Sequence, residues 1–439
     1  MRPESWQTAS ALPAAARRDR HSAGGRDWRV PDNDLLPLLQ QRLRGLYSPL
    51  LADSTATILF TAGGMANWTV EIEKGRASAR RGGPVTPTTT VRASLAVLDD
   101  VVSGARSGIE AFLAGELTVR GNLALALQLD GLFPSENGDD SGRTHTRSVI
   151  AGGIETFYLE SGPVDAPPIV LVHGLSATNA SMLPLIPALS KHYRVLAPDL
   201  PGHGGTQARH SAHAAAYLGT WLAAFVRETC DQPAVLIGNS LGGRTSLQTA
   251  LDHPELVRGL VLLCPAVAFR RLRQFVPFVR LVRDELAVLP LRIPRPLAMR
   301  GLRSLFADAS RLPQPWYDAA IDEFLRVLGN RSNRQATFSA LRHIYLDEPF
   351  GGSGFWDRLP TLRPPALFVW GDRDVLVPAG FSRFVEAALP EGGSVVLPDC
   401  GHVPQFEYPE LTARLATDFI AALPELPAIA DTACTVVGG

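Results

Sequence analysis

The stretch Val235-Leu-Ile-Gly-Asn-Ser-Leu-Gly-Gly243 decides which fold the chain is expected to adopt. Its opening Val-Leu-Ile is an apolar run typical of a buried strand, and Gly238–Gly242 matches the pattern G-x-S-x-G. In this pattern a sharp turn from strand to helix exposes the serine hydroxyl, here that of Ser240, and small neighbours let the backbone pass. Alone the motif is weak, because a glycine-rich turn contains the same residue types.

Strands and helices are expected to alternate on both sides of this motif. Pro168–Val172, Val257–Leu263 and Ala366–Trp370 are apolar runs typical of strands that are buried on both faces. Alternation of such strands with helical segments predicts a mostly parallel α/β sheet with right-handed connections. The alternation is interrupted from about residue 268 to 357, where helical stretches, prolines and aromatic residues predict a helical cap.

Composition excludes several classes of protein. The 439 residues suggest two or three domains, and a hydrophobic fraction of 46% is enough for a sizeable core. A net charge of -1 gives no attraction toward nucleic acid, so no nucleic-acid partner is expected. We expect no transmembrane segment, although transient contact with a membrane surface stays open. The four cysteines lack metal-ligand spacing, and with no signal peptide apparent they predict reduced thiols in a cytoplasmic protein.

The residues before this α/β region have a different pattern. Residues 1–33 are expected to be disordered, and from Thr55 several segments alternate polar and apolar residues as half-buried strands do. Ala111-Phe-Leu-Ala-Gly-Glu-Leu-Thr-Val-Arg-Gly-Asn122, followed by Leu-Ala-Leu-Ala-Leu127, resembles a sterol-carrier-protein-type lipid-binding domain over residues 34–133. The resemblance implies a small α+β domain with an antiparallel sheet and helices around an apolar tunnel for acyl chains or sterols. A fully packed core without a ligand is the alternative.

Five motifs in residues 147–425 together resemble the α/β-hydrolase superfamily, in its serine esterase and lipase-like branch. They are His173-Gly174, the Pro198–Gly204 loop, the Gly238–Gly242 motif, Gly371-Asp-Arg-Asp374 and Gly401-His402. The resemblance implies an α/β-hydrolase fold with a helical cap. Residues 134–146 are the expected linker between the two domains, and residues 426–439 the expected loose tail.

The resemblance and the chemistry of these residue types assign a catalytic triad. Ser240 is the expected nucleophile, and His402 is the base that removes its hydroxyl proton. Asp374 is expected to orient the imidazole and to stabilise its charged form. Asp372 is a nearby competitor, but the resemblance favours Asp374, the second acid of Gly371-Asp-Arg-Asp374.

The main chain is expected to stabilise negative charge on the substrate. The backbone N–H groups of Leu175 and Leu241 form the predicted oxyanion hole. Asp199 and His203 are expected to be structural, and His173 to shape the oxyanion loop. The expected supporting residues are His173, Gly174, Gly238, Asn239 and Gly242.

A serine nucleophile narrows the chemistry. It excludes the branches that need an aspartyl ester, namely epoxide hydrolases and haloalkane dehalogenases, and leaves esterases, lipases and carbon–carbon bond hydrolases. The last group usually carries Trp after the catalytic His, where this chain has Val403, so ester hydrolysis is favoured. A non-catalytic lipid carrier with a vestigial hydrolase domain is the other alternative.

The expected partner is a lipophilic ester or an acyl lipid. No cofactor or metal is expected, and the oligomeric state stays open. The cap is expected to contribute apolar side chains to the site, among them Phe275, Phe278, Trp316 and Phe324.

Overall fold

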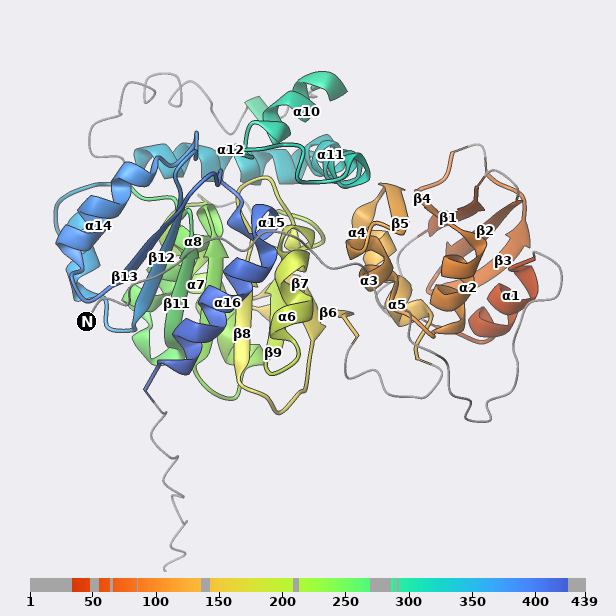
Figure 1. The fold of residues 1–439 in the computed structure, drawn as a ribbon, viewed down its shortest axis with the longest axis horizontal. Coiled ribbons are helices and arrows are strands. Elements are labelled where there is room, and N and C mark those ends of the chain that lie inside the picture. The colour runs from red at the N-terminus through yellow and green to blue at the C-terminus, as the bar shows by residue number, and fades with distance from the viewer. Residues whose placement is uncertain are drawn as a thin grey trace, which may run out of the picture.

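The chain folds around two separate sheets. A computed structural model describes residues 34–47, 55–63, 66–84, 86–135, 143–207, 213–268, 286–287, 289 and 292–424. A small α+β unit lies at the right of Figure 1, and a larger α/β unit lies at the left. The predicted disordered N-terminus, the predicted loose tail, Phe275 and Phe278 all lie outside the described residues.

The small unit holds a five-stranded sheet in the order β3-β2-β1-β4-β5, with helices packed against it. Its strands are β1 (Thr55–Ala62), β2 (Ala66–Glu73), β3 (Arg76–Arg81), β4 (Thr89–Ala93) and β5 (Leu117–Gly121). Its helices are α1 (Leu36–Leu43), α2 (Leu95–Ser103), α3 (Gly108–Leu113), α4 (Leu123–Leu127) and α5 (Leu129–Leu132).

The sheet of the small unit differs from the sequence expectation in two respects. It is mixed rather than purely antiparallel, because the β2–β3 hairpin lies on one side of β1 and β4 pairs with the other side in parallel. The pattern also missed β3, whose residues Arg-Ala-Ser-Ala-Arg-Arg are mostly exposed. Such a charged edge strand lacks the apolar alternation by which strands are predicted.

The larger unit holds an eight-stranded sheet in the order β13-β12-β11-β10-β8-β9-β7-β6. β6 and β7 pair antiparallel with their neighbours, and the other neighbouring strands run parallel. The strands are β6 (His145–Ala151), β7 (Ile154–Ser161), β8 (Pro168–Val172), β9 (Arg194–Pro198), β10 (Ala234–Asn239), β11 (Val257–Leu263), β12 (Ala366–Gly371) and β13 (Gly393–Leu397).

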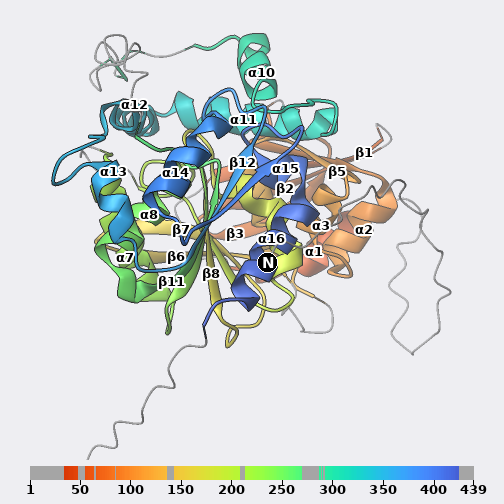
Figure 2. The same ribbon diagram turned by 60° about the vertical axis from the view of Figure 1, so that its left-hand side comes forward.

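Helices cover both faces of this sheet (Figure 2). One face packs against α7 (Ala215–Thr229), α8 (Leu241–Asp252), α13 (Phe355–Arg358) and α14 (Ser382–Ala388). The other packs against α6 (Ile186–Leu189) and α16 (Pro409–Ala421). Successive residues of β10 alternate between these two cores, Leu236 on the first and Ile237 on the second. The central strand is therefore buried on both faces, as its apolar run predicts.

A group of cap helices interrupts the α/β alternation between β11 and β12. Among the described residues this group includes α10 (Arg295–Arg303), α11 (Gln314–Gly329) and α12 (Arg331–Leu346), which lie together along one edge of the larger unit in Figure 1. The short helix α15 (Pro404–Glu407) follows the predicted catalytic histidine. Within the described part of the chain, no helix combines the length and the apolarity that crossing a membrane requires.

Candidate active site

Ser240 lies in a strained turn between β10 and α8. Its φ of 52° and ψ of -114° are unfavourable for a side chain with a Cβ atom. The glycines beside it have no room for a side chain. A Cβ atom on Gly238 would lie 2.5 Å from the carbonyl group of Gly242, and one on Gly242 would lie 2.1 Å from the Val172 carbonyl oxygen. The turn therefore requires the small residues of the G-x-S-x-G pattern.

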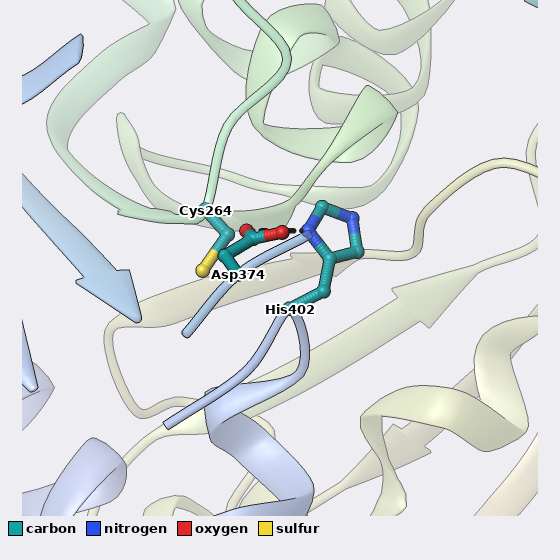
Figure 3. A group of neighbouring side chains, drawn as sticks. All are labelled: Cys264, Asp374 and His402. Atoms are coloured by element: carbon teal, nitrogen blue, oxygen red, sulfur yellow. Dashed lines mark hydrogen bonds and ion pairs between the residues drawn. The ribbon is translucent and has the colours of Figure 1, made fainter. Parts of the chain in front are cut away.

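His402 and Asp374 form a buried pair (Figure 3). The imidazole Nδ1 lies 2.7 Å from the Asp374 Oδ2. The other carboxylate oxygen accepts hydrogen bonds from the backbone N–H groups of Leu376 (2.7 Å) and Val377 (2.9 Å), which fix the acid in place. A proton on Nδ1, shared with the carboxylate, leaves Nε2 as the nitrogen that can accept a proton.

The competing acid, Asp372, has a different environment. Its side chain is exposed, and its Oδ1 accepts a hydrogen bond of 3.3 Å from the Cys400 backbone N–H. Asp372 thus stabilises the loop before the histidine, whereas Asp374 contacts the imidazole.

The loop that carries His402 is tied to its surroundings by two side chains. The Asn239 amide donates hydrogen bonds of 3.1 Å to the carbonyl oxygens of His402 and Leu263. The buried Glu407 carboxylate accepts from the N–H groups of Gly401 (2.5 Å) and Ala307 (2.9 Å). Sequence reasoning missed Glu407, whose only signal was an acid on the turn after the histidine. These bonds connect the histidine loop to β10 and to the segment after α10.

The predicted oxyanion loop lies directly beside the serine turn. A Cβ atom on Gly174 would lie 3.4 Å from the Ser240 Cβ, and both Gly174 and Leu175 line the same cavity as Ser240. Leu241 is the first residue of α8, so its N–H is among the unpaired donors of a helix N-terminus. The chain thus brings both predicted oxyanion donors to the neighbourhood of the hydroxyl.

His173 is buried, and both of its ring nitrogens contact the backbone near the predicted oxyanion loop. Its Nε2 accepts a 2.9 Å hydrogen bond from the Leu200 N–H, and its Nδ1 lies 2.8 Å from the Gly174 carbonyl oxygen. Complete burial lowers the pKa of His173 to about 3, so the ring is neutral near pH 7.

The loop after β9 is held by a buried acid. Asp199 accepts hydrogen bonds from the N–H groups of Asn179 (2.7 Å) and Gly205 (2.9 Å), and burial raises its pKa to about 7. His203 is also buried, which lowers its pKa to about 4, and its Nδ1 lies 3.2 Å from the Pro201 carbonyl oxygen. These contacts are internal to the fold and give both residues a structural role.

Ser240 and His402 open into one cavity of about 690 Å³. Its walls are mostly apolar and include Trp316 and Phe324, two of the side chains that the sequence predicts there. This volume is in the range of small-molecule sites. The cavity therefore suits an apolar ligand with one reactive group beside the serine.

Cys264 is a third side chain next to the His402–Asp374 pair (Figure 3). One atom from each of Cys264, Asp374 and His402 lies within 4.8 Å of the others, a spacing that could hold a metal ion. Burial raises the pKa of Cys264 well above its usual value, which disfavours the thiolate that metals bind. Asp374 and His402 are already hydrogen-bonded to each other. These three residues are therefore better explained as a hydrogen-bonded acid–base pair beside a buried thiol than as a metal centre.

Neutral burial of His203 makes folding sensitive to acid. Its pKa is about 4 in the folded chain and 6.5 when exposed, so its contribution to stability is present above 6.5 and is lost as pH falls toward 4. The amide of His203→Asn can also donate to the Pro201 carbonyl but does not titrate. We therefore expect the free energy of unfolding of this variant to fall less steeply between pH 6.5 and 4, by up to about 1.4 kcal/mol per pH unit. Denaturant unfolding of the unmodified chain and the variant at a series of pH values measures this difference in slope. Parallel plots of unfolding free energy against pH would contradict the prediction.

Comparison with known proteins agrees with the two folded units of the chain. Residues 169–415 match the Alpha/beta hydrolase family, and residues 35–134 match the SCP-2 sterol transfer family. The chain is 28% identical to the uncharacterized hydrolase YugF of Bacillus subtilis (strain 168) over 280 residues, which are 62% of this chain and 97% of that protein.

Two further relatives carry more specific names. The 2-hydroxy-6-oxo-6-(2'-aminophenyl)hexa-2,4-dienoic acid hydrolase of Metapseudomonas resinovorans is 27% identical, over 63% of this chain and 90% of that protein. The crystal structure of a membrane phospholipase A is similar with a TM-score of 0.55 at 25% identity, over 74% of this chain and 96% of that chain. Both resemblances predicted from sequence are thus confirmed: the chain belongs to the alpha/beta hydrolase family and carries an N-terminal SCP2 sterol transfer domain.

Proposed function

We propose that the protein is a serine hydrolase that cleaves a lipophilic carboxylic ester. The observation that carries this proposal is a mostly apolar cavity with Ser240 at a strained turn and His402 paired with Asp374. A lipophilic acyl group suits such walls, and a polar ester group suits the serine end. The similarity to a phospholipase A further supports a lipid ester.

The proposed reaction begins with attack by the serine. Ser240 Oγ bonds to the ester carbonyl carbon while His402 Nε2 takes the hydroxyl proton. Asp374 stabilises the imidazolium that forms. The carbonyl oxygen becomes an oxyanion, which the N–H groups of Leu241 and Leu175 stabilise, and one such donor is typically worth about a hundredfold to a thousandfold in rate.

The second half of the reaction releases both products. The imidazolium donates its proton to the departing alcohol oxygen, and the carbon–oxygen bond of the ester breaks to leave an acyl group on Ser240. Water then attacks the acyl-enzyme, with His402 taking one water proton and returning it to Ser240. The products are one alcohol and one carboxylic acid, and no step needs a cofactor.

We also propose that the two domains have different functions. Residues 34–133 bind a lipid, residues 134–146 link the two domains, and residues 147–425 form the hydrolase with a cap at about 268–357. The match of residues 35–134 to the SCP-2 sterol transfer family supports lipid binding. Covalent attachment keeps a bound lipid near the hydrolase and so raises its effective concentration there.

A carbon–carbon bond hydrolase is the second candidate. It is favoured by the 27% identity to a hydrolase of a dienoic acid from Metapseudomonas resinovorans. Against it, Val403 lines the cavity at the position after the histidine, where that group usually has Trp. Hydrolysis of a ring-cleavage dienoic acid faster than of any p-nitrophenyl ester would favour this second candidate.

Loss of the nucleophile tests the proposal most directly. We expect the intact chain to hydrolyse p-nitrophenyl esters, and Ser240→Ala to reduce kcat by about 10⁴-fold or more because no acyl-enzyme can form. Release of p-nitrophenol measures both chains. Equal turnover by the two would refute the serine mechanism and favour a lipid carrier with a vestigial hydrolase domain.

The two candidate acids provide a matched comparison. We expect Asp374→Asn to lower kcat by roughly 10³- to 10⁴-fold, because an amide no longer stabilises the imidazolium or fixes the tautomer. Asp372→Asn should change kcat by less than about threefold, because that side chain is exposed and the amide oxygen of Asn can still accept the Cys400 N–H. Ester hydrolysis by both variants measures the difference, and the reverse order would reassign the acid.

Chelators distinguish the triad from a metal centre. Because the Cys264 thiol is held protonated and Asp374 already pairs with His402, we expect ester hydrolysis to be unchanged after dialysis against EDTA. Activity that disappears on dialysis and returns with added Zn²⁺ would instead show that these three residues bind a metal.

A further inference from the structure

The cavity that holds Ser240 is not enclosed by the hydrolase domain alone. Its lining includes Phe112 from α3 and Leu123 from α4, both in the SCP2 domain. Both side chains are buried, with 5% and 6% of their surface exposed. We call the contact of α3 and α4 with the cap helix α11 the seam. Part of the cavity wall is therefore formed at the seam.

Aromatic rings connect the seam with the catalytic histidine loop. Phe112 stacks on Trp316 of α11, with ring centroids 4.9 Å apart and planes inclined by 25°. Trp316 meets Phe406 edge-on, at 5.7 Å and 89°, and Phe406 lies on α15, the helix after His402. All three rings line the cavity. One apolar surface thus extends from the SCP2 domain to the proposed catalytic residues.

An ion pair fixes the seam. Asp322 on α11 accepts hydrogen bonds from the Arg120 Nε (2.7 Å) and the Gly121 N–H (3.0 Å), and it also contacts Arg295 of the cap. Burial raises the pKa of Asp322, but the hydrogen bonds from these three residues outweigh it, and the pKa lies below its usual value. The charged carboxylate therefore holds the turn between β5 and α4, which places Leu123 at the cavity.

We propose that the SCP2 domain forms part of the acyl-chain site of the hydrolase, with Phe112 and Leu123 contacting the distal carbons of a chain whose ester group lies at Ser240. This inference rests on the proposed ester hydrolysis and names the substrate feature that the fusion recognises. A long acyl chain is removed from water by both domains, whereas a short one ends before the seam. The SCP2 domain thus contributes to chain-length specificity.

Variants from both sides of the seam test this inference in the full-length chain. We expect Phe112→Ala and Trp316→Ala each to lower the kcat/KM ratio of p-nitrophenyl decanoate to p-nitrophenyl acetate by about tenfold, because each removes apolar contact with the distal carbons. The matched control is Leu113→Ala. Leu113 is the neighbour of Phe112 on α3, is half-buried, and does not line the cavity, so its ratio should stay within about twofold of the unmodified chain.

Chain folding is checked by circular dichroism. If Phe112→Ala does not fold, Phe112→Leu replaces it, since leucine keeps an apolar side chain in the core and should lower the ratio in the same direction by a smaller factor. An unchanged ratio in folded variants at both Phe112 and Trp316, with Ser240→Ala inactive, would overturn the shared acyl site and leave the proposed hydrolase standing.

A binding measurement covers the case in which the unmodified chain hydrolyses neither ester, which would refute the proposed function. Titration with 11-(dansylamino)undecanoic acid then measures the apolar site without turnover. We expect about tenfold weaker binding in Phe112→Ala and Trp316→Ala, and unchanged binding in Leu113→Ala. Equal affinity in all of these chains would overturn the shared site.

Discussion

The backbone turn at Ser240 is the constraint on which the rest of the site depends. A residue with a positive φ persists only where its surroundings determine it. Here Gly242 packs against the carbonyl groups of Val172 and His173 at the end of β8, and the Asn239 amide bridges the end of β11 and the histidine loop. Contacts of the residues on either side of Ser240 therefore direct its hydroxyl toward the cavity and also position the histidine loop. These contacts offset the backbone strain at Ser240.

The histidines around this turn have different environments. His173 and His203 are buried without a charge, and they hold loops through hydrogen bonds to the backbone. His402 instead faces a carboxylate on one side and the cavity on the other. The contrast agrees with a site in which a single imidazole changes its charge during the reaction. The same burial makes the motif histidine His173 a poor candidate for the base.

The two domains share more than a linker. The SCP2 domain packs directly against the cap helix α11. It is held there by the contacts of Asp322 with Arg120 and Arg295 and by the stacking of Phe112 on Trp316. A charged carboxylate fixes the position of the seam, and apolar rings supply its contact with the cavity. In this arrangement the fused SCP2 domain forms part of the wall of the serine cavity.

The amino-acid sequence by itself predicted the parallel central strands and the serine turn, because apolar runs and glycines act locally. Its motifs predicted the two families by resemblance. It also selected Asp374 over Asp372 through resemblance, and the structure brings Asp374 to the imidazole. It missed the exposed strand β3 and the bridging role of Glu407, since neither has a local apolar signal. Only the tertiary structure decided that Phe112 reaches the serine cavity, because such a contact depends on how two separately folded surfaces pack.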